Sequence, residues 1–117
     1  MIGEPNGRPD SSPETQRLLF ELMSRSANTD TMNGRALVFQ FRFSDADPWH
    51  LVVDNGSTLV EPGEAPNPDL TVDTDWAQLV EITTRGENPL RALARRRLRP
   101  HGSVRGFRGF AKTFPPS

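Results

Sequence analysis

Residues 37–43 are Leu-Val-Phe-Gln-Phe-Arg-Phe, and residues 49–56 are Trp-His-Leu-Val-Val-Asp-Asn-Gly. In both stretches alternate residues are large and apolar, which is the two-residue period of a β-strand with one buried face. Asn55-Gly56 predicts a hairpin turn, because both residue types tolerate the positive φ angles of a tight turn. The two stretches therefore predict paired strands. Their expected buried face carries Leu37, Phe39, Phe41, Phe43, Trp49, Leu51 and Val53.

Further strands are predicted after this pair. Residues 57–61 and 70–72 have strand character, and a loop with three prolines separates them. We expect the first four strands to form a meander. Residues 98–114 combine glycines with Val104, Phe107 and Phe110, and we expect an irregular strand there, with Pro100 at a sheet edge or a bulge because it cannot donate to a ladder.

Helices are predicted on both sides of the strands. Ser12 and Pro13 have the residue types of a helix start, Thr74 is the expected cap of a second helix, and Asn88-Pro89 begins a third. The apolar residues that recur at helical spacing are Leu18, Leu19, Leu22 and Met23 in the first helix; Trp76, Leu79 and Val80 with Thr83 in the second; and Leu90, Leu93 and Ala94 in the third. These faces are expected to pack on the sheet.

The length of 117 residues corresponds to one domain. Residues 1–12 contain almost nothing to bury and are expected to form a flexible arm, with a single domain over 13–117. The absence of cysteine excludes disulfides and thiolate chemistry. The sequence shows neither a membrane-spanning apolar run nor a signal peptide, so we expect a soluble, cytoplasmic protein.

Charge is distributed unevenly along the chain. Residues 1–87 carry a formal charge of −9 and residues 88–117 carry +8. Five arginines lie close together: Arg91, Arg95, Arg96, Arg97 and Arg99. Two interpretations stay open. The acidic part of the same domain neutralises the cluster, or the cluster binds an anion.

No motif predicts catalysis, a metal or a cofactor. His50 and His101 are far apart in sequence, and the glycine-rich and metal-binding signatures of common enzymes are absent. Residues 105–110 interleave arginine and phenylalanine as RNA-binding sheets do, but the pattern has one inserted residue and the predicted order of elements differs. We therefore expect no nucleic-acid partner.

The order and spacing of these elements resemble one known family. The residues that carry the resemblance are 38–41, 49–56, 68–72 and 88–93, followed by the glycine-punctuated segment 98–114. Over residues 13–114 the chain is similar to the sterol carrier protein type 2 family. The resemblance implies an α+β fold with a five-stranded, largely antiparallel sheet covered on one face by helices. It also implies an apolar pocket between these layers for sterols, fatty acids or acyl-CoA, and no fixed catalytic residues.

We accordingly predict a carrier that binds a hydrophobic small molecule. The residues expected to line the pocket are Phe39, Phe41, Phe43, Trp49, Trp76, Leu79, Leu90, Leu93, Phe107 and Phe110. Those expected to hold an anionic head group are Arg91, Arg95, Arg96 and Arg99. Two alternatives stay open, a small biosynthetic enzyme that uses His50, Asp73 or an arginine, and a protein-interaction module. A dimer partner or the first helix would cover the pocket.

Overall fold

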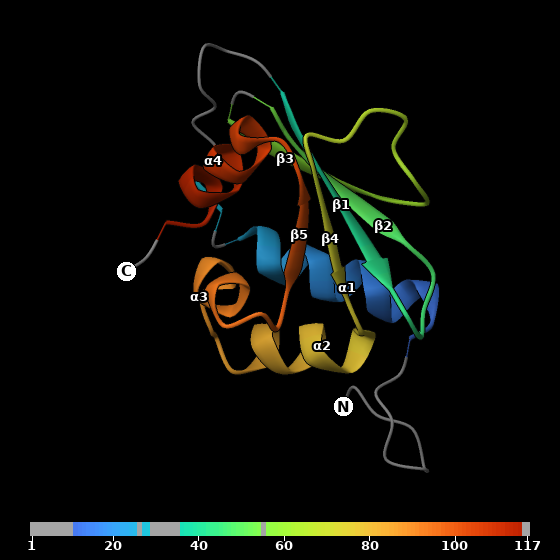
Figure 1. Ribbon diagram of the computed structural model, residues 1–117. Helices are drawn as coiled ribbons and strands as arrows, with labels where there is room; N and C mark the ends of the chain where they lie inside the picture. The colour runs from blue at the N-terminus through green and yellow to red at the C-terminus, as the bar shows by residue number, and fades with distance from the viewer. Residues whose placement is uncertain (1–10, 26, 29–35, 55, 116–117) are drawn as a thin grey trace.

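The computed structural model describes residues 11–25, 27–28, 36–54 and 56–115 (Figure 1). Nearly all of the predicted arm, residues 1–10, lies outside this range. The elements in chain order are α1 (Pro13–Ser24), β1 (Leu37–Phe43), β2 (Trp49–Asp54), β3 (Ser57–Pro62), β4 (Leu70–Thr74), α2 (Trp76–Thr84), α3 (Pro89–Ala94), β5 (Arg99–Gly102) and α4 (Val104–Thr113). The strands form a five-stranded sheet in the order β3-β2-β1-β4-β5.

The predicted α+β fold with a largely antiparallel sheet is confirmed. Neighbouring strands are antiparallel except β4, which runs parallel to β1 with Phe41 opposite Val72. The prediction of a four-stranded meander is therefore wrong at its last strand. The reason is the segment after β3, which the Gln40 side chain holds against β1. Gln40 accepts a hydrogen bond from the Ala65 amide at 2.7 Å and donates one to the Gly63 carbonyl at 3.2 Å.

Aromatic contacts place the helices on one face of the sheet. Phe20 of α1 lies edge-on to Phe41 with ring centroids 5.1 Å apart. Phe43 contacts Trp76 of α2 at 5.4 Å, and Phe39 contacts Phe110 of α4 at 5.4 Å. Because Phe39, Phe41 and Phe43 alternate along β1, all three contacts are on the same side of the sheet. The core therefore lies between this face and the helices.

Helix starts follow the predicted residues closely. Ser12 caps α1 and Asn88 caps α3, with prolines in the first turns of both helices. In α2, Asp75 is the cap and accepts from the Gln78 amide at 2.7 Å, whereas the Thr74 hydroxyl donates to the Arg97 carbonyl at 2.9 Å. The prediction of Thr74 as the cap is therefore wrong by one residue, because this hydroxyl has a long-range partner.

The buried face of α1 differs from the predicted one. Leu18 and Leu22 are 63% and 50% exposed, whereas Phe20 is fully buried. The buried residues of α1 are Gln16, Leu19, Phe20 and Met23. Residue spacing alone did not distinguish this face from the predicted one, because several leucines lie at adjacent positions.

The C-terminal segment is mostly helical, which corrects the predicted irregular strand over 98–114. Only Arg99–Gly102 forms a strand, β5, and Pro100 lies in this edge strand as predicted. Ser103 then caps α4. Gly106 and Gly109 lie three residues apart on the buried side of α4, where they allow close packing. The close neighbours of these glycines, Asp69 and Leu37, are distant in the chain, so the local sequence does not show this packing.

Candidate ligand-binding site

Most of the residues predicted to line a pocket are packed in the core. The side chains of Phe39, Phe41, Trp49, Trp76, Leu79 and Phe110 are at most 1% exposed, and Leu93 is 6% exposed. Phe43 and Leu90 are partly buried against this core, and Phe107 is 40% exposed. Of these ten residues, only Trp49 and Leu93 line any of the cavities described below.

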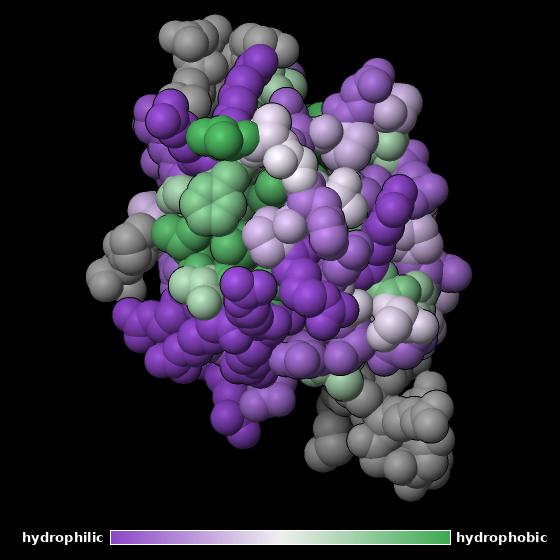
Figure 2. Space-filling view, viewed as in Figure 1, coloured by the Kyte–Doolittle hydropathy of each residue, from purple (hydrophilic) through white to green (hydrophobic). Residues whose placement is uncertain are grey.

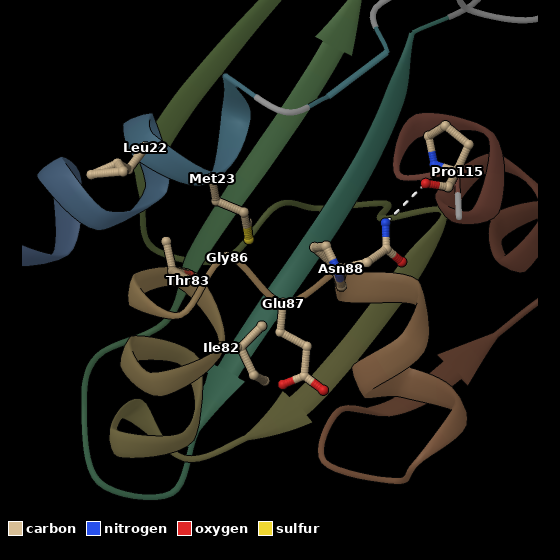
Figure 3. Close-up of a pocket in the computed structure, with 9 residues that line it drawn as sticks. Leu22, Met23, Ile82, Thr83, Gly86, Glu87, Asn88 and Pro115 are labelled. Carbon is tan, nitrogen blue, oxygen red and sulfur yellow. Dashed lines mark hydrogen bonds between the residues drawn. The ribbon is translucent and has the colours of Figure 1, made fainter. Parts of the chain in front are cut away.

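An apolar cavity of about 410 Å³ opens between the end of α1, the α2–α3 junction and the C-terminal segment (Figure 3). We call it the α1–α2 cavity. Its apolar lining comes from Leu22 and Met23 of α1, Ile82 of α2, Pro89 of α3, and Pro115. Gly86, Glu87, Asn88 and Thr83 complete the wall. These residues were not predicted from the sequence to bind a ligand, and the signal that could have indicated them is the apolar face of α1, which includes Leu22 and Met23.

Asn88 connects two segments at the rim of this cavity. Its Nδ2 donates to the Pro115 carbonyl at 2.9 Å, while its Oδ1 accepts from the Arg91 amide at 3.1 Å (Figure 3). The N-terminal cap of α3 therefore also holds the C-terminal segment beside the cavity. The C-terminal segment at Pro115 therefore forms one side of the cavity.

Two polar side chains of the cavity wall, those of Glu87 and Thr83, differ in whether they have a partner. The Glu87 side chain is 14% exposed and forms an ion pair with Arg97 at 2.5 Å and another with Arg95 at 3.8 Å. The Thr83 hydroxyl oxygen is buried and has no hydrogen-bond partner among the described residues. Arginines therefore neutralise the charge of Glu87, whereas the Thr83 hydroxyl beside the cavity has no partner among the described residues.

The arginines predicted to hold a head group are distributed over different sites. Arg95 pairs with Glu87, and Arg97 pairs with both Glu87 and Glu81, as expected if the acidic part of the domain neutralises the cluster. Arg91 is exposed on α3. Arg96 and Arg99 instead line a second cavity of about 390 Å³ between α3 and β5.

A third, open cavity of about 490 Å³ involves Trp49. It lies at the start of α1, where Arg17 is 5.2 Å from the centre of the Trp49 ring. Its other lining residues are Pro13, Glu14, Leu18 and Pro62. Trp49 is itself 1% exposed, so it contributes little surface there.

The residues considered for catalysis are bound to other groups of the protein. His50 Nδ1 lies 3.0 Å from the Gly63 carbonyl, and His101 Nε2 lies 2.9 Å from Asp73 Oδ2. Within the described residues, no cluster of three or more histidine or acidic side chains is arranged to hold a metal. Residues 105–110, which resemble an RNA-binding strand in sequence, lie in α4.

Comparison with known proteins identifies the family. The model of the family described as "Alkyl sulfatase C-terminal" matches residues 13–116. The chain belongs to the alkyl sulfatase C-terminal family. No curated protein matches the sequence significantly.

Solved structures show the same fold. A double mutant of the sec-alkylsulfatase PisA1, an enzyme from Pseudomonas sp., matches with a TM-score of 0.62 and 21% identity, over 91% of this chain. The match covers only 17% of the length of that enzyme.

Two sterol carrier structures also match. Sterol carrier protein 2 like 2 from Aedes aegypti matches with a TM-score of 0.56 and 18% identity, over 84% of this chain and 94% of its own. A Thermus thermophilus protein described as possibly a sterol carrier protein matches with a TM-score of 0.50 and 18% identity, over 97% and 88% of the two chains. The predicted sterol-carrier-like fold is confirmed. Among the described residues, none of the helices combines the length and the hydropathy that a membrane span requires.

Proposed function

We propose that this chain binds the apolar part of a small molecule, an alkyl chain, in the α1–α2 cavity and acts as a carrier or recruitment domain. The observation that carries the proposal is the cavity of about 410 Å³ with Leu22, Met23, Ile82 and Pro89 in its wall. Small-molecule sites have volumes of roughly 300–1,000 Å³ and are mainly apolar. This cavity is at the small end of that range, which favours a single chain over a bulky ring system.

Leu22 provides the strongest support from a single residue. It is 50% exposed although it is a large apolar side chain beside a cavity. A ligand chain that covers Leu22 would remove this surface from water, and burial of apolar surface is favourable by about 25 cal/mol per Å². Leu22 therefore gains contacts from a ligand that the protein alone does not supply.

The family supports an alkyl chain as the ligand. The chain belongs to the alkyl sulfatase C-terminal family and shares the fold of a sec-alkylsulfatase, an enzyme whose name indicates an alkyl substrate. The sterol carrier structures with this fold are consistent with a hydrophobic ligand in more general terms. An apolar chain is the chemical feature that alkyl esters and lipids share.

The test is a titration of the protein with straight-chain alcohols from 1-butanol to 1-octanol, followed by the amide chemical shifts in NMR spectra. Each added methylene that enters the cavity contributes about 0.8 kcal/mol, so affinity should rise by up to about fourfold per carbon. The affected amides should be those of residues 82–88. Affinity that does not change with chain length would contradict the proposal.

The matched variants are Leu22→Ser and Leu18→Ser. Both leucines are on α1, four residues apart and at least half exposed, but only Leu22 lines the α1–α2 cavity. We expect Leu22→Ser to weaken 1-octanol binding about fivefold, which corresponds to roughly 1 kcal/mol of lost apolar contact. Leu18→Ser should bind as the unmodified protein does. Equal losses in both variants would mean that the alcohol binds elsewhere on α1.

A further inference from the structure

We propose that the cavity between α3 and β5 is a second binding site, which takes a small organic oxyanion, a carboxylate or phosphate carried on an apolar group, through Arg96 and Arg99. We call it the α3–β5 cavity. This site goes beyond the proposed alkyl-chain site and does not depend on it. The two cavities share no lining residue, since the first is at the start of α3 and the second at its end.

The wall of the α3–β5 cavity has an apolar and a cationic part. Leu93, Ala94, Leu98 and Pro100 provide the apolar part, and Arg96 and Arg99 lie beside them. Figure 2 shows hydrophobic surface over α4 and toward α3, bordered by strongly hydrophilic surface on the side of α3. An amphiphilic anion has the matching division, an apolar body and a charged head.

Arg96 and Arg99 differ from their neighbours in having no carboxylate partner. Arg85, Arg95 and Arg97 form ion pairs with Glu81 or Glu87, whereas Arg96 and Arg99 form none within the described residues. Asp73 is opposite Arg99 across the strand pair, but its carboxylate lies 2.9 Å from His101 Nε2, and His101 also lines the cavity. Within the described residues, Arg96 and Arg99 therefore lack the direct ion pairs that neutralise Arg97.

The backbone at Arg96 supports a role for its side chain. Hydrogen bonds from the Arg96 amide to Leu93 and from the Arg97 amide to Ala92 close α3, and they leave Arg96 at φ +62°. Glycine usually occupies this helix-ending position, because other residues pay a steric cost there. Within the described residues no other non-glycine residue has a positive φ. An arginine at this position has a conformational cost, and it places a guanidinium at the cavity.

The chemistry of arginine defines the ligand class. The guanidinium is planar, always charged and presents paired N–H donors that match the oxygens of carboxylate and phosphate groups. An exposed pair of such groups holds an anion far better when an adjacent apolar wall removes part of the ligand from water. A short fatty acid or an alkyl phosphate satisfies both requirements.

The experiment uses octanoate, octyl phosphate, 1-octanol and inorganic phosphate as probes, with amide chemical shifts as the readout. We expect octanoate and octyl phosphate to shift the amides of residues 93–99 and 101–102, and added salt to weaken this binding. Inorganic phosphate and 1-octanol should each bind there at least about tenfold more weakly, because each lacks one of the two contacts. Inorganic phosphate that binds as tightly as octyl phosphate, or 1-octanol that binds as tightly as octanoate, would overturn the proposal.

Three variants localise the effect. Arg96→Gly and Arg99→Gln should each weaken octanoate binding by about tenfold or more, the usual loss for one charge-assisted contact. Arg96→Gly should also unfold at the same or a higher temperature, since glycine relieves the positive φ, and this separates lost binding from lost folding. Arg91→Gln is the control, because Arg91 is exposed on the same helix without lining the cavity.

Two outcomes would contradict this site. An equal loss in Arg91→Gln would assign the binding to diffuse attraction by the basic end of the chain. If octanoate and octyl phosphate shift only amides of residues 82–88, these probes bind in the α1–α2 cavity, and the oxyanion site is overturned while the proposed alkyl-chain function is supported. If the two probes shift only amides of residues 93–102, the oxyanion site is supported, and the alkyl-chain function is judged by the alcohol titration.

Discussion

Among the described residues, the buried hydroxyl oxygen of Thr83 has no hydrogen-bond partner. A buried hydroxyl that has lost its water without gaining a hydrogen bond costs roughly 1–3 kcal/mol. Valine has the same branched shape without the hydroxyl. Thr83→Val should therefore raise the free energy of unfolding by about 1 kcal/mol, measured by denaturant titration.

Thr84 offers a control at the next position of α2. Its hydroxyl donates to the Val80 carbonyl at 2.7 Å, and the residue is exposed. Thr84→Val changes the same atoms but removes an existing hydrogen bond, so it should give no gain in stability. If both variants are stabilised equally, the gain comes from the helix preference of valine in this context and not from the unpaired hydroxyl.

At the scale of one element, α4 has two glycines on its buried side, and they differ in what surrounds them. A Cβ atom at Gly106 would lie 1.8 Å from the Asp69 carbonyl oxygen, whereas one at Gly109 would lie 2.9 Å from a methyl carbon of Leu37. The first neighbour is backbone and cannot move aside easily, but the second is the end of a flexible side chain. Close approach of α4 to the start of β4 therefore requires glycine at 106.

This difference predicts the effect of two alanine substitutions. In a helix interior, Gly→Ala usually stabilises by about 1 kcal/mol through helix propensity. We expect Gly106→Ala to lower the free energy of unfolding by about 3 kcal/mol despite this gain, because α4 must shift away from the sheet. Gly109→Ala should change it by less than about 1 kcal/mol. Similar stabilities for the two variants, in denaturant titrations, would show that α4 is not held against Asp69.

At the scale of the whole molecule, all four helices and the strands β1 to β4 contribute to a single core. The cluster of buried residues extends from Leu19 in α1 to Phe114 after α4. Arg97 adds polar connections between α2, the α2–α3 junction and β4, with its side chain bonded to Gln78 and Glu87 and its carbonyl to Thr74. One continuous core of this size is expected to unfold in one cooperative step.

The two tryptophans allow unfolding to be followed separately in the sheet and in the helices. Trp49 lies in β2 and Trp76 in α2, and both are 1% exposed. In Trp49→Phe the fluorescence reports on α2, and in Trp76→Phe it reports on the sheet. For each variant we expect the fluorescence midpoint in denaturant to coincide with the midpoint from far-ultraviolet circular dichroism. Separate transitions would mean that the helices and the sheet unfold independently.

The local sequence determined the elements whose signals are confined to a few neighbouring residues. The alternation in residues 37–43 and 49–54 predicted β1 and β2, and Ser12-Pro13 and Asn88-Pro89 predicted the starts of α1 and α3. These signals are strong because side-chain alternation and capping act within one or two turns of chain. The order of these elements was also sufficient to indicate the sterol-carrier-like fold.

The tertiary structure decided what depends on residues far apart in the chain. By its alternation in β1, Gln40 belongs to the exposed face, yet it is only 1% exposed. Residues 63–65 cover it: the Gly63 carbonyl accepts a hydrogen bond from its side chain, and the Ala65 amide donates one to it. This contact helps to hold the segment between β3 and β4, and β4 lies beside β1, where local patterns favoured a meander. In the same way, Gly106 lowers helix propensity locally, but close packing against the Asp69 backbone requires glycine at this position of a helix.

The candidate sites required tertiary structure for the same reason. The sequence determined which residues are apolar. Whether Phe41 fills the core or lines a cavity depends on its neighbours in the fold, such as Phe20, which packs against Phe41 and Trp49. The five arginines are equivalent in sequence, and only the fold separates Arg97, which pairs with Glu81 and Glu87, from Arg96, which faces a cavity. Residue type is a property of the chain, whereas the space and charge around a side chain are set by elements distant in sequence.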